Sequence, residues 1–127
     1  MAGLAKTIGN GAATNSFTEI GTHSNCIMMI GSTPENGHPI VAMHVQRALN
    51  RGAKLIVIDP VKTEFANRAD IHLQLEPEHN IPVINALIHA IIDEDLVNHE
   101  FVNKYTKGFE YVKEAVKDYS PEAVAKY

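Results

Sequence analysis

The chain has 127 residues, of which 45% are hydrophobic and 20% charged, which is an ordinary balance for one globular domain with its own core. Its formal net charge of −4 argues against a nucleic-acid partner, because binding to phosphate backbones needs a basic surface. The single cysteine excludes an internal disulfide and an iron–sulfur cluster held by this chain alone. No apolar run approaches the roughly 20 residues of a membrane span, and the first residues lack a signal-peptide pattern. We therefore expect a cytoplasmic protein without a membrane span.

A Gly- and Asn-rich stretch opens the chain and contains Gly9-Asn10-Gly11. It has neither the spacing of a dinucleotide-binding fingerprint nor a Gly-Lys-Ser/Thr ending, so it is a weak indication of a phosphate loop. A short helix should follow, with its N-cap near Thr14 or Asn15.

The first strand is expected over residues 26–30, a short and continuous apolar run. Such runs are typical of parallel strands that are buried on both faces. By this interpretation Met28 and Met29 belong to the core, and Cys26 is an inert core thiol rather than a nucleophile. A polar loop over residues 31–38 follows the strand.

Apolar residues recur at helical spacing over residues 39–50, which predicts an amphipathic helix with Pro39 in its first turn. Gly52 suits the left-handed position that follows a helix. The second buried strand is expected over residues 54–58, and Asp59-Pro60 comes directly after it. A buried strand, a helix and a second buried strand form a Rossmann-like half of an α/β layer, and such layers bind ligands at the carboxyl ends of their strands.

A short helix or turn is expected over residues 63–68, and a third strand over residues 71–75, whose alternation suits a position nearer the sheet edge. Asn80 is a plausible N-cap for a helix that reaches about Ile92 and carries a wide apolar stripe. The remainder reads as helical. The predicted fold is therefore a single three-layer α/β domain over residues 1–127, with a short, mainly parallel sheet flanked by helices and a helical C-terminal tail.

Asp59 is the strongest single candidate for a binding residue. A carboxylate at a strand end can accept hydrogen bonds from sugar hydroxyls or from the N1–H and N2–H₂ edge of guanine. The alternative is that Asp59 only caps the following Asp-Pro turn. Likewise, the loop over residues 31–38 offers backbone N–H groups for a phosphate, or is an ordinary connection between a strand and a helix. Both alternatives stay open at this point.

The seven histidines show no close spacing typical of metal ligands, so we expect no metal site in this chain. Asp93-Glu94-Asp95 is expected to be a solvated helix end rather than an acid–base pair.

Several motifs in series resemble the molybdopterin oxidoreductase family. They are Gly-Asn-Gly-Ala-x-Thr-Asn-Ser, then Gly-Ser-x-Pro-x-x-x-His-Pro after the first strand, then Gly-Ala-Lys-Leu-Ile-Val-Ile-Asp-Pro, then Ala-Asp-x-His-Leu-x-Leu. Within the family, the chain is most similar to the catalytic alpha subunit of molybdenum- or tungsten-dependent formate dehydrogenases.

The resemblance implies an α/β segment that binds one molybdopterin guanine dinucleotide, with Asp59 at its guanosine end. The implied contacts are Gly31, Ser32, Thr33, Asn36, Ile58, Asp59, Glu78 and Asn80. The chain departs from the family pattern at three positions, where members often carry Asn in place of Thr33, Arg in place of Val61 and Gly in place of Glu78. Val61 cannot offer the fork of donors that Arg has, and Glu78 would repel a pyrophosphate unless its side chain points away.

The resemblance also places the metal-binding cysteine or selenocysteine, and the cluster cysteines, upstream of this segment. The family's catalytic histidine and arginine have no matched position here. We therefore expect an inactive segment of a formate dehydrogenase that has no catalytic residue or metal ligand of its own. The parent would oxidise formate to CO₂ at molybdenum or tungsten and pass electrons to 4Fe–4S clusters. Its implied partners are the remaining domains of the parent subunit and an iron–sulfur electron-transfer subunit.

Three alternatives remain. The parent could be another molybdopterin oxidoreductase, of the nitrate or polysulfide type. The chain could also be a free-standing nucleotide-binding module, or an assembly domain whose pocket is vestigial.

Overall fold

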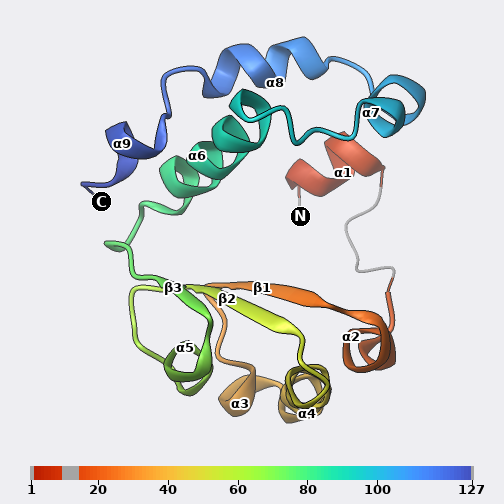
Figure 1. The fold of residues 1–127 in the computed structure, drawn as a ribbon, viewed down its shortest axis with the longest axis vertical. Coiled ribbons are helices and arrows are strands. Elements are labelled where there is room, and N and C mark those ends of the chain that lie inside the picture. Colours follow the sequence, from red (N-terminus) through yellow and green to blue (C-terminus); the bar gives the residue numbers. More distant parts are fainter. Residues whose placement is uncertain (1, 10–14, 127) are drawn as a thin grey trace. The chain divides into compact units, whose positions relative to one another are not determined.

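The computed structural model describes residues 2–9 and 15–126, and its chain divides into two compact units, Met1–Leu73 and Gln74–Tyr127. The first unit holds the sheet, and the second is helical (Figure 1). The segment Asn10-Gly11 and the cap position expected at Thr14 lie outside the described residues.

Three parallel strands form one open sheet in the order β1-β2-β3. Figure 1 shows α2, α3, α4 and α5 on one face of this sheet. An α/β fold with a parallel sheet is therefore confirmed. The elements of the first unit are α1 (Ala2–Ile8), α2 (Phe17–His23), β1 (Cys26–Ile30), α3 (Pro34–Gly37), α4 (Pro39–Asn50), β2 (Lys54–Ile58), α5 (Glu64–Arg68) and β3 (Ile71–Leu73).

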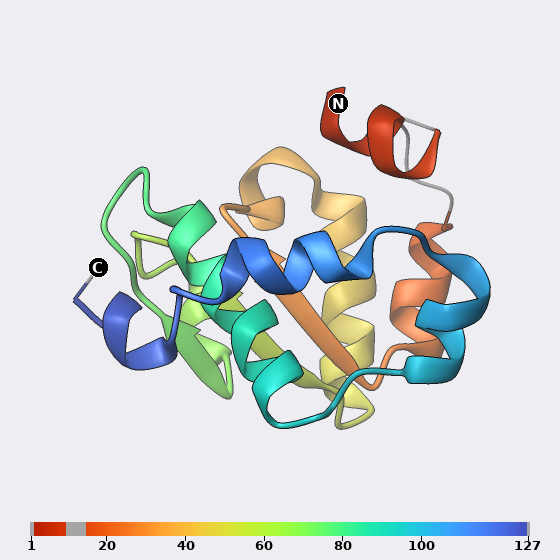
Figure 2. The same cartoon turned by 90° about the horizontal axis from the view of Figure 1, so that it is seen from above.

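The core of the first unit forms between β2 and the helices, because β2 is the central strand. Leu55 and Val57 are fully buried there, with Met29 of β1 and Val45 of α4 packed against them. Figure 2 shows α4 running beside the strands that it covers. The helix ends where expected, since Gly52 takes a left-handed φ of +93° directly after its C-cap.

The prediction that β1 is buried on both faces is wrong. Cys26 is exposed, and so is Met28, whose exposed fraction is 54%, so neither is a core residue, whereas Met29 is buried as predicted. Alternate side chains of a strand point to opposite faces of the sheet, and only the face of Met29 meets the helices that pack beneath β1. An apolar run alone does not reveal that one of its faces is left uncovered by neighbouring helices.

The third strand is shorter than predicted and ends at Leu73 instead of residue 75. In the parallel register Leu73 lies opposite Ile58, the last residue of β2. Gln74 and Leu75 follow beyond the last residue pair of this ladder. The position of β3 at a sheet edge is confirmed.

The N-cap of α2 is Ser16, the residue that follows the expected cap Asn15. The hydroxyl of Ser16 accepts a hydrogen bond from the Glu19 N–H at 3.4 Å, and the Glu19 carboxylate accepts one from the Ser16 N–H at 2.8 Å. This capping box lowers the pKa of Glu19, first through the backbone bond from Ser16. Asn15 is therefore not the N-cap.

The second unit consists of helices joined by short turns. Contacts join α6 to α8 and to α9, and Figure 2 shows α8 passing across α6. His89 of α6 bonds the Val116 carbonyl of α8 at 2.9 Å. The elements are α6 (Asn80–Asp93), α7 (His99–Tyr105), α8 (Phe109–Val116) and α9 (Pro121–Val124).

The helix predicted to begin with an Asn80 cap has His79 as its N-cap instead, and Asn80 is its first helical residue. The preceding Glu78 takes a left-handed φ of +72°, so the turn into the helix is made one residue earlier. The predicted end is confirmed, because Asp93 is the last helical residue and Glu94 is the C-cap.

Candidate functional site

Two strand-end loops of the first unit are tied together by one backbone hydrogen bond. The N–H of Gly31, directly after β1, donates to the carbonyl of Ile58, the last residue of β2, at 2.9 Å. Gly31 has a φ of +53°, and a Cβ added to it would meet nothing within 4 Å. The structure thus brings the loop after β1 beside Ile58 and Asp59, with open space over the glycine.

The loop after β1 uses part of its donor set internally. The N–H groups of Asn36 and Gly37 both donate to the Thr33 carbonyl, at 3.1 and 3.2 Å. Among the described residues, the N–H groups of Ser32 and Thr33 have no acceptor. Of the loop positions predicted from sequence, these two N–H groups can therefore serve an anion, whereas Asn36 can contribute its exposed side chain but not its backbone donor.

Asp59 is buried, with an exposed fraction of 7%. Its Oδ1 accepts a hydrogen bond from the Val61 N–H at 2.8 Å, so the turn-capping role that the sequence allowed is present. Within the described part of the chain, no donor bonds Oδ2. One carboxylate oxygen thus serves the turn, and the other remains for a ligand.

The backbone of Asp59 is held by β3. Its N–H donates to the Leu73 carbonyl at 3.2 Å, and its carbonyl lies 3.0 Å from Nε2 of His72. Sequence reasoning placed His72 merely among the scattered histidines. The signal that could have found it is its position in the strand next to the one that ends at Asp59.

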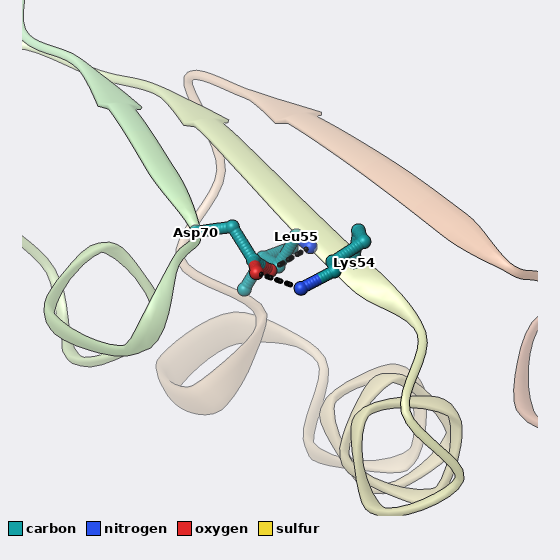
Figure 3. A network of polar contacts seen from close by, with 3 residues as sticks. All are labelled: Lys54, Leu55 and Asp70. Atoms are coloured by element: carbon teal, nitrogen blue, oxygen red, sulfur yellow. Dashed lines mark hydrogen bonds and ion pairs between the residues drawn. The ribbon is translucent and has the colours of Figure 1, made fainter.

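An ion pair at the opposite ends of the strands aligns β3 with β2 (Figure 3). The Asp70 carboxylate accepts from Lys54 Nζ at 2.7 Å and from the Leu55 N–H at 2.9 Å. The bond from Lys54 is the main cause that lowers the pKa of Asp70, and the bond to Asp70 raises the pKa of Lys54. The Asp70 N–H also donates to the Leu55 carbonyl at 2.8 Å. Together these bonds of Asp70 fix the register of β3 on β2, which brings Leu73 beside Asp59.

Glu35 is a second feature that the sequence did not reveal. It lies in α3 within the loop after β1, and its Oε2 is buried without a hydrogen-bond partner among the described residues. A buried carboxylate oxygen without a donor is costly, so it is a further acceptor that a ligand with N–H or O–H groups could satisfy.

A pocket of about 310 Å³ lies on the helix side of the same loop. Its lining is mainly apolar and includes Ile20, Met28 and Val41, and its polar residues include Ser32 and His38. Asp59 is not part of its lining, so this pocket shares only Ser32 with the predicted contacts.

The last two predicted contacts, Glu78 and Asn80, belong to the second unit. Both are exposed and lie at the entrance to α6, where the His79 N–H bonds the Glu76 carbonyl at 3.2 Å. The structure therefore presents the predicted residues as two groups. One contains Gly31, Ser32, Thr33, Asn36, Ile58 and Asp59, and the other contains Glu78 and Asn80.

In the described ranges, no cluster of three or more His, Cys, Asp or Glu side chains could hold a metal ion. No described helix is both long and apolar enough to cross a bilayer.

Comparisons with known proteins identify the relatives of this chain. A family model described as "Molybdopterin oxidoreductase" matches residues 3–117. The chain is 44% identical over 126 residues to the F420-dependent formate dehydrogenase subunit alpha of Methanocaldococcus jannaschii, covering 99% of this chain and 19% of that protein. It is 44% identical over 124 residues to formate dehydrogenase H of Escherichia coli, covering 98% of this chain and 17% of that protein.

Among solved structures, acetylene hydratase from Pelobacter acetylenicus superposes with a TM-score of 0.77 at 33% identity, covering 87% of this chain and 16% of that one. The chain spans less than a fifth of the length of each of these relatives. The family model matches most of the chain, two relatives are more than 40% identical to it, and a solved relative shares its fold. This chain therefore belongs to the molybdopterin oxidoreductase family.

Proposed function

We propose that this chain is the segment of a formate dehydrogenase alpha subunit that binds one molybdopterin guanine dinucleotide. The similarity to two formate dehydrogenases over almost the whole chain supports the enzyme class. The observation that carries the binding role is Asp59, a buried carboxylate at a strand end whose Oδ2 has no donor among the described residues.

The residues present fit the guanosine diphosphate end of such a cofactor. Asp59 Oδ2 would accept hydrogen bonds from guanine N–H groups or from sugar hydroxyls. The N–H groups of Ser32 and Thr33 would donate to phosphate oxygens, and the missing side chain of Gly31 leaves room for close approach. Ile58 would contribute backbone alone, and Asn36 and Asn80 their side-chain amides.

Two positions fit less well. Val61 is an exposed apolar side chain, and its N–H is already used by Asp59. Glu78 carries a negative charge at the entrance to α6, which would repel a phosphate that approached it. We therefore assign Val61 no contact and expect Glu78 to contribute its backbone rather than its carboxylate.

The chemistry of the parent would be the conversion of formate to CO₂, which releases two electrons and a proton. The bound molybdenum or tungsten cofactor supplies the redox centre for that step. One cysteine cannot hold a 4Fe–4S cluster, so the clusters would belong to the rest of the parent and to an iron–sulfur partner subunit. In this proposal residues 1–127 act together as one cofactor-binding segment of a cytoplasmic enzyme. The segment by itself is inactive.

The test is an NMR titration of the ¹⁵N-labelled chain with GDP and, in parallel, with ADP. We expect shifts at Gly31, Ser32, Thr33 and Asp59 with GDP and weaker ones with ADP. The decisive variant is Asp59→Asn, because its side-chain oxygen can still accept from Val61 while an NH₂ replaces Oδ2 and faces the guanine donors. The matched control is Asp93→Asn, an exposed residue at the end of α6.

Asp59→Asn should weaken GDP binding by about tenfold, the loss of a charge-assisted hydrogen bond. Asp93→Asn should leave it unchanged. Equal affinity of the Asp59→Asn variant and the unmodified chain for GDP would contradict the proposed role. An equal response to GDP and ADP would instead favour a general nucleotide-binding module.

A second candidate parent is a molybdopterin oxidoreductase that is not a formate dehydrogenase. The solved relative with a TM-score of 0.77 is an acetylene hydratase, so this segment also occurs in a protein whose name is not that of a formate dehydrogenase. A parent of the nitrate or polysulfide type would bind the same cofactor through the same loops. Assay of the full-length parent with formate against nitrate and polysulfide distinguishes the classes.

A further inference from the structure

His72 is connected to the candidate site through one hydrogen bond. It lies in the middle of β3, it is half-buried, and its Nε2 is 3.0 Å from the carbonyl oxygen of Asp59. A carbonyl oxygen can only accept, so the bond requires the proton on Nε2 of the ring. The structure therefore assigns a protonated Nε2 to His72.

The carbonyl of Asp59 needs such a donor for a topological reason. The ladder between β2 and β3 ends at the pair Ile58 and Leu73, and among the described residues no backbone N–H donates to the Asp59 carbonyl. A buried carbonyl without a donor is costly. The ring of His72 donates the hydrogen bond to the Asp59 carbonyl that a neighbouring strand would otherwise supply.

With His72 in place, Asp59 is held at three points. Its N–H bonds Leu73, its carbonyl bonds His72, and its Oδ1 bonds the Val61 N–H. Two of these three bonds come from β3. Oδ2 is the oxygen left over, and its direction follows from the other three contacts.

We propose that His72 is a positioning residue that orients the Asp59 carboxylate for a guanine nucleotide, an inference that rests on the proposed function. It does not touch the nucleotide itself. It fixes the peptide that follows Asp59 so that Oδ1 caps the turn while Oδ2 points to the ligand. The ligand class is a guanosine diphosphate group, bound through guanine or sugar donors.

The test uses two variants of the full chain. In His72→Gln the side-chain amide can place a donor near the position of Nε2, whereas His72→Leu removes the donor and keeps an apolar side chain of similar size. The control is His89→Leu, which removes a similar histidine-to-carbonyl bond in the second unit.

The first measurement needs no ligand. It is amide hydrogen exchange at Val61, whose N–H bonds Asp59 Oδ1, with Leu55 as an internal reference. In His72→Leu the Val61 amide should exchange about fivefold faster, the equivalent of one hydrogen bond, while Leu55 does not change. His72→Gln should restore the protection, and His89→Leu should not disturb it. Unchanged exchange at Val61 in His72→Leu would overturn the proposal.

Two further measurements accompany it. Ring ¹⁵N spectra at neutral pH should show a protonated Nε2 on His72, and the opposite tautomer would overturn the assignment. The dissociation constant for GDP should rise about fivefold in His72→Leu and change less than about twofold in His72→Gln. If the unmodified chain does not bind GDP, the proposed function fails, but the exchange at Val61 still decides whether His72 holds Asp59. If GDP binds and His72→Leu has no effect on its affinity, the positioning role alone fails.

Discussion

The N–H of Gly31 donates to the carbonyl of Ile58 at 2.9 Å, so the loops after β1 and β2 begin at the same level of the sheet. Gly31 reaches this bond with a φ of +53°, in the left-handed region that glycine favours. The chain thereby turns away from the strand immediately and leaves space above the sheet edge.

Gly31→Ala should lower the free energy of unfolding by about 1 kcal/mol, because an L-residue pays for the left-handed conformation. No steric clash adds to this cost, since a Cβ at this position meets nothing within 4 Å. The measurement is urea denaturation followed by circular dichroism. Gly37→Ala is the matched control, because its surroundings are equally open and its φ is outside the left-handed region. Equal losses of stability in both variants would contradict the explanation.

Glu78→Gly should stabilise the chain by about 1 kcal/mol, since Glu78 has a φ of +72° and glycine adopts that conformation without strain. The control is Glu76→Gly, an exposed glutamate nearby whose φ is not positive, which should lose stability or remain neutral. Thermal unfolding of the two variants in parallel measures the difference. If Glu78→Gly is the less stable of the two, the backbone at residue 78 is not strained.

Gly21→Ala should destabilise the first unit by about 1–3 kcal/mol, because α2 and α4 approach closely at this residue. A Cβ there would lie 2.9 Å from Nδ1 of His44 and 3.3 Å from the His44 carbonyl oxygen. His44 is buried, so its ring has little room to move aside. Gly3→Ala is the control, since Gly3 is helical and has nothing within 4 Å. Chemical denaturation of both variants gives the comparison, and a stable Gly21→Ala variant would argue against the close packing of α2 on α4.

The ion pair between Lys54 and Asp70 should make the free energy of unfolding decrease as the pH falls into the acidic range. The folded-state pKa of Asp70 is lowered, so its stabilising contribution is present above the unfolded-state pKa and is lost as the pH falls through the folded-state value. The pKa of Lys54 is raised, so its contribution is present below its unfolded-state pKa and is lost as the pH rises through the folded-state value.

Between neutral and acidic pH, the free energy of unfolding should therefore fall more steeply in the unmodified chain than in Asp70→Asn. The Asn side chain can still accept from the Leu55 N–H, so this variant isolates the charge. Asp118→Asn, at an exposed position of the second unit, should leave the pH profile as it is. Parallel profiles for Asp70→Asn and the unmodified chain would show that the ion pair does not contribute.

The sequence by itself determined the elements whose patterns are local. The helix over Pro39–Asn50 and the strand over Lys54–Ile58 have the predicted bounds, because their apolar spacing and the Gly52 stop signal act over a few residues. The motifs were also enough to indicate the family, since a series of loops in a set order is specific even where each loop alone is not.

Tertiary structure alone decided the rest. Whether Cys26 and Met28 are buried depends on which face of the sheet the helices cover, and the end of β3 depends on where its partner β2 stops. The contact between His72 and Asp59 joins residues 13 positions apart, and it exists because a parallel ladder places one strand's side chain beside the next strand's end. Local patterns specify elements, whereas exposure and cross-strand contacts follow from the packing of elements that are distant in sequence.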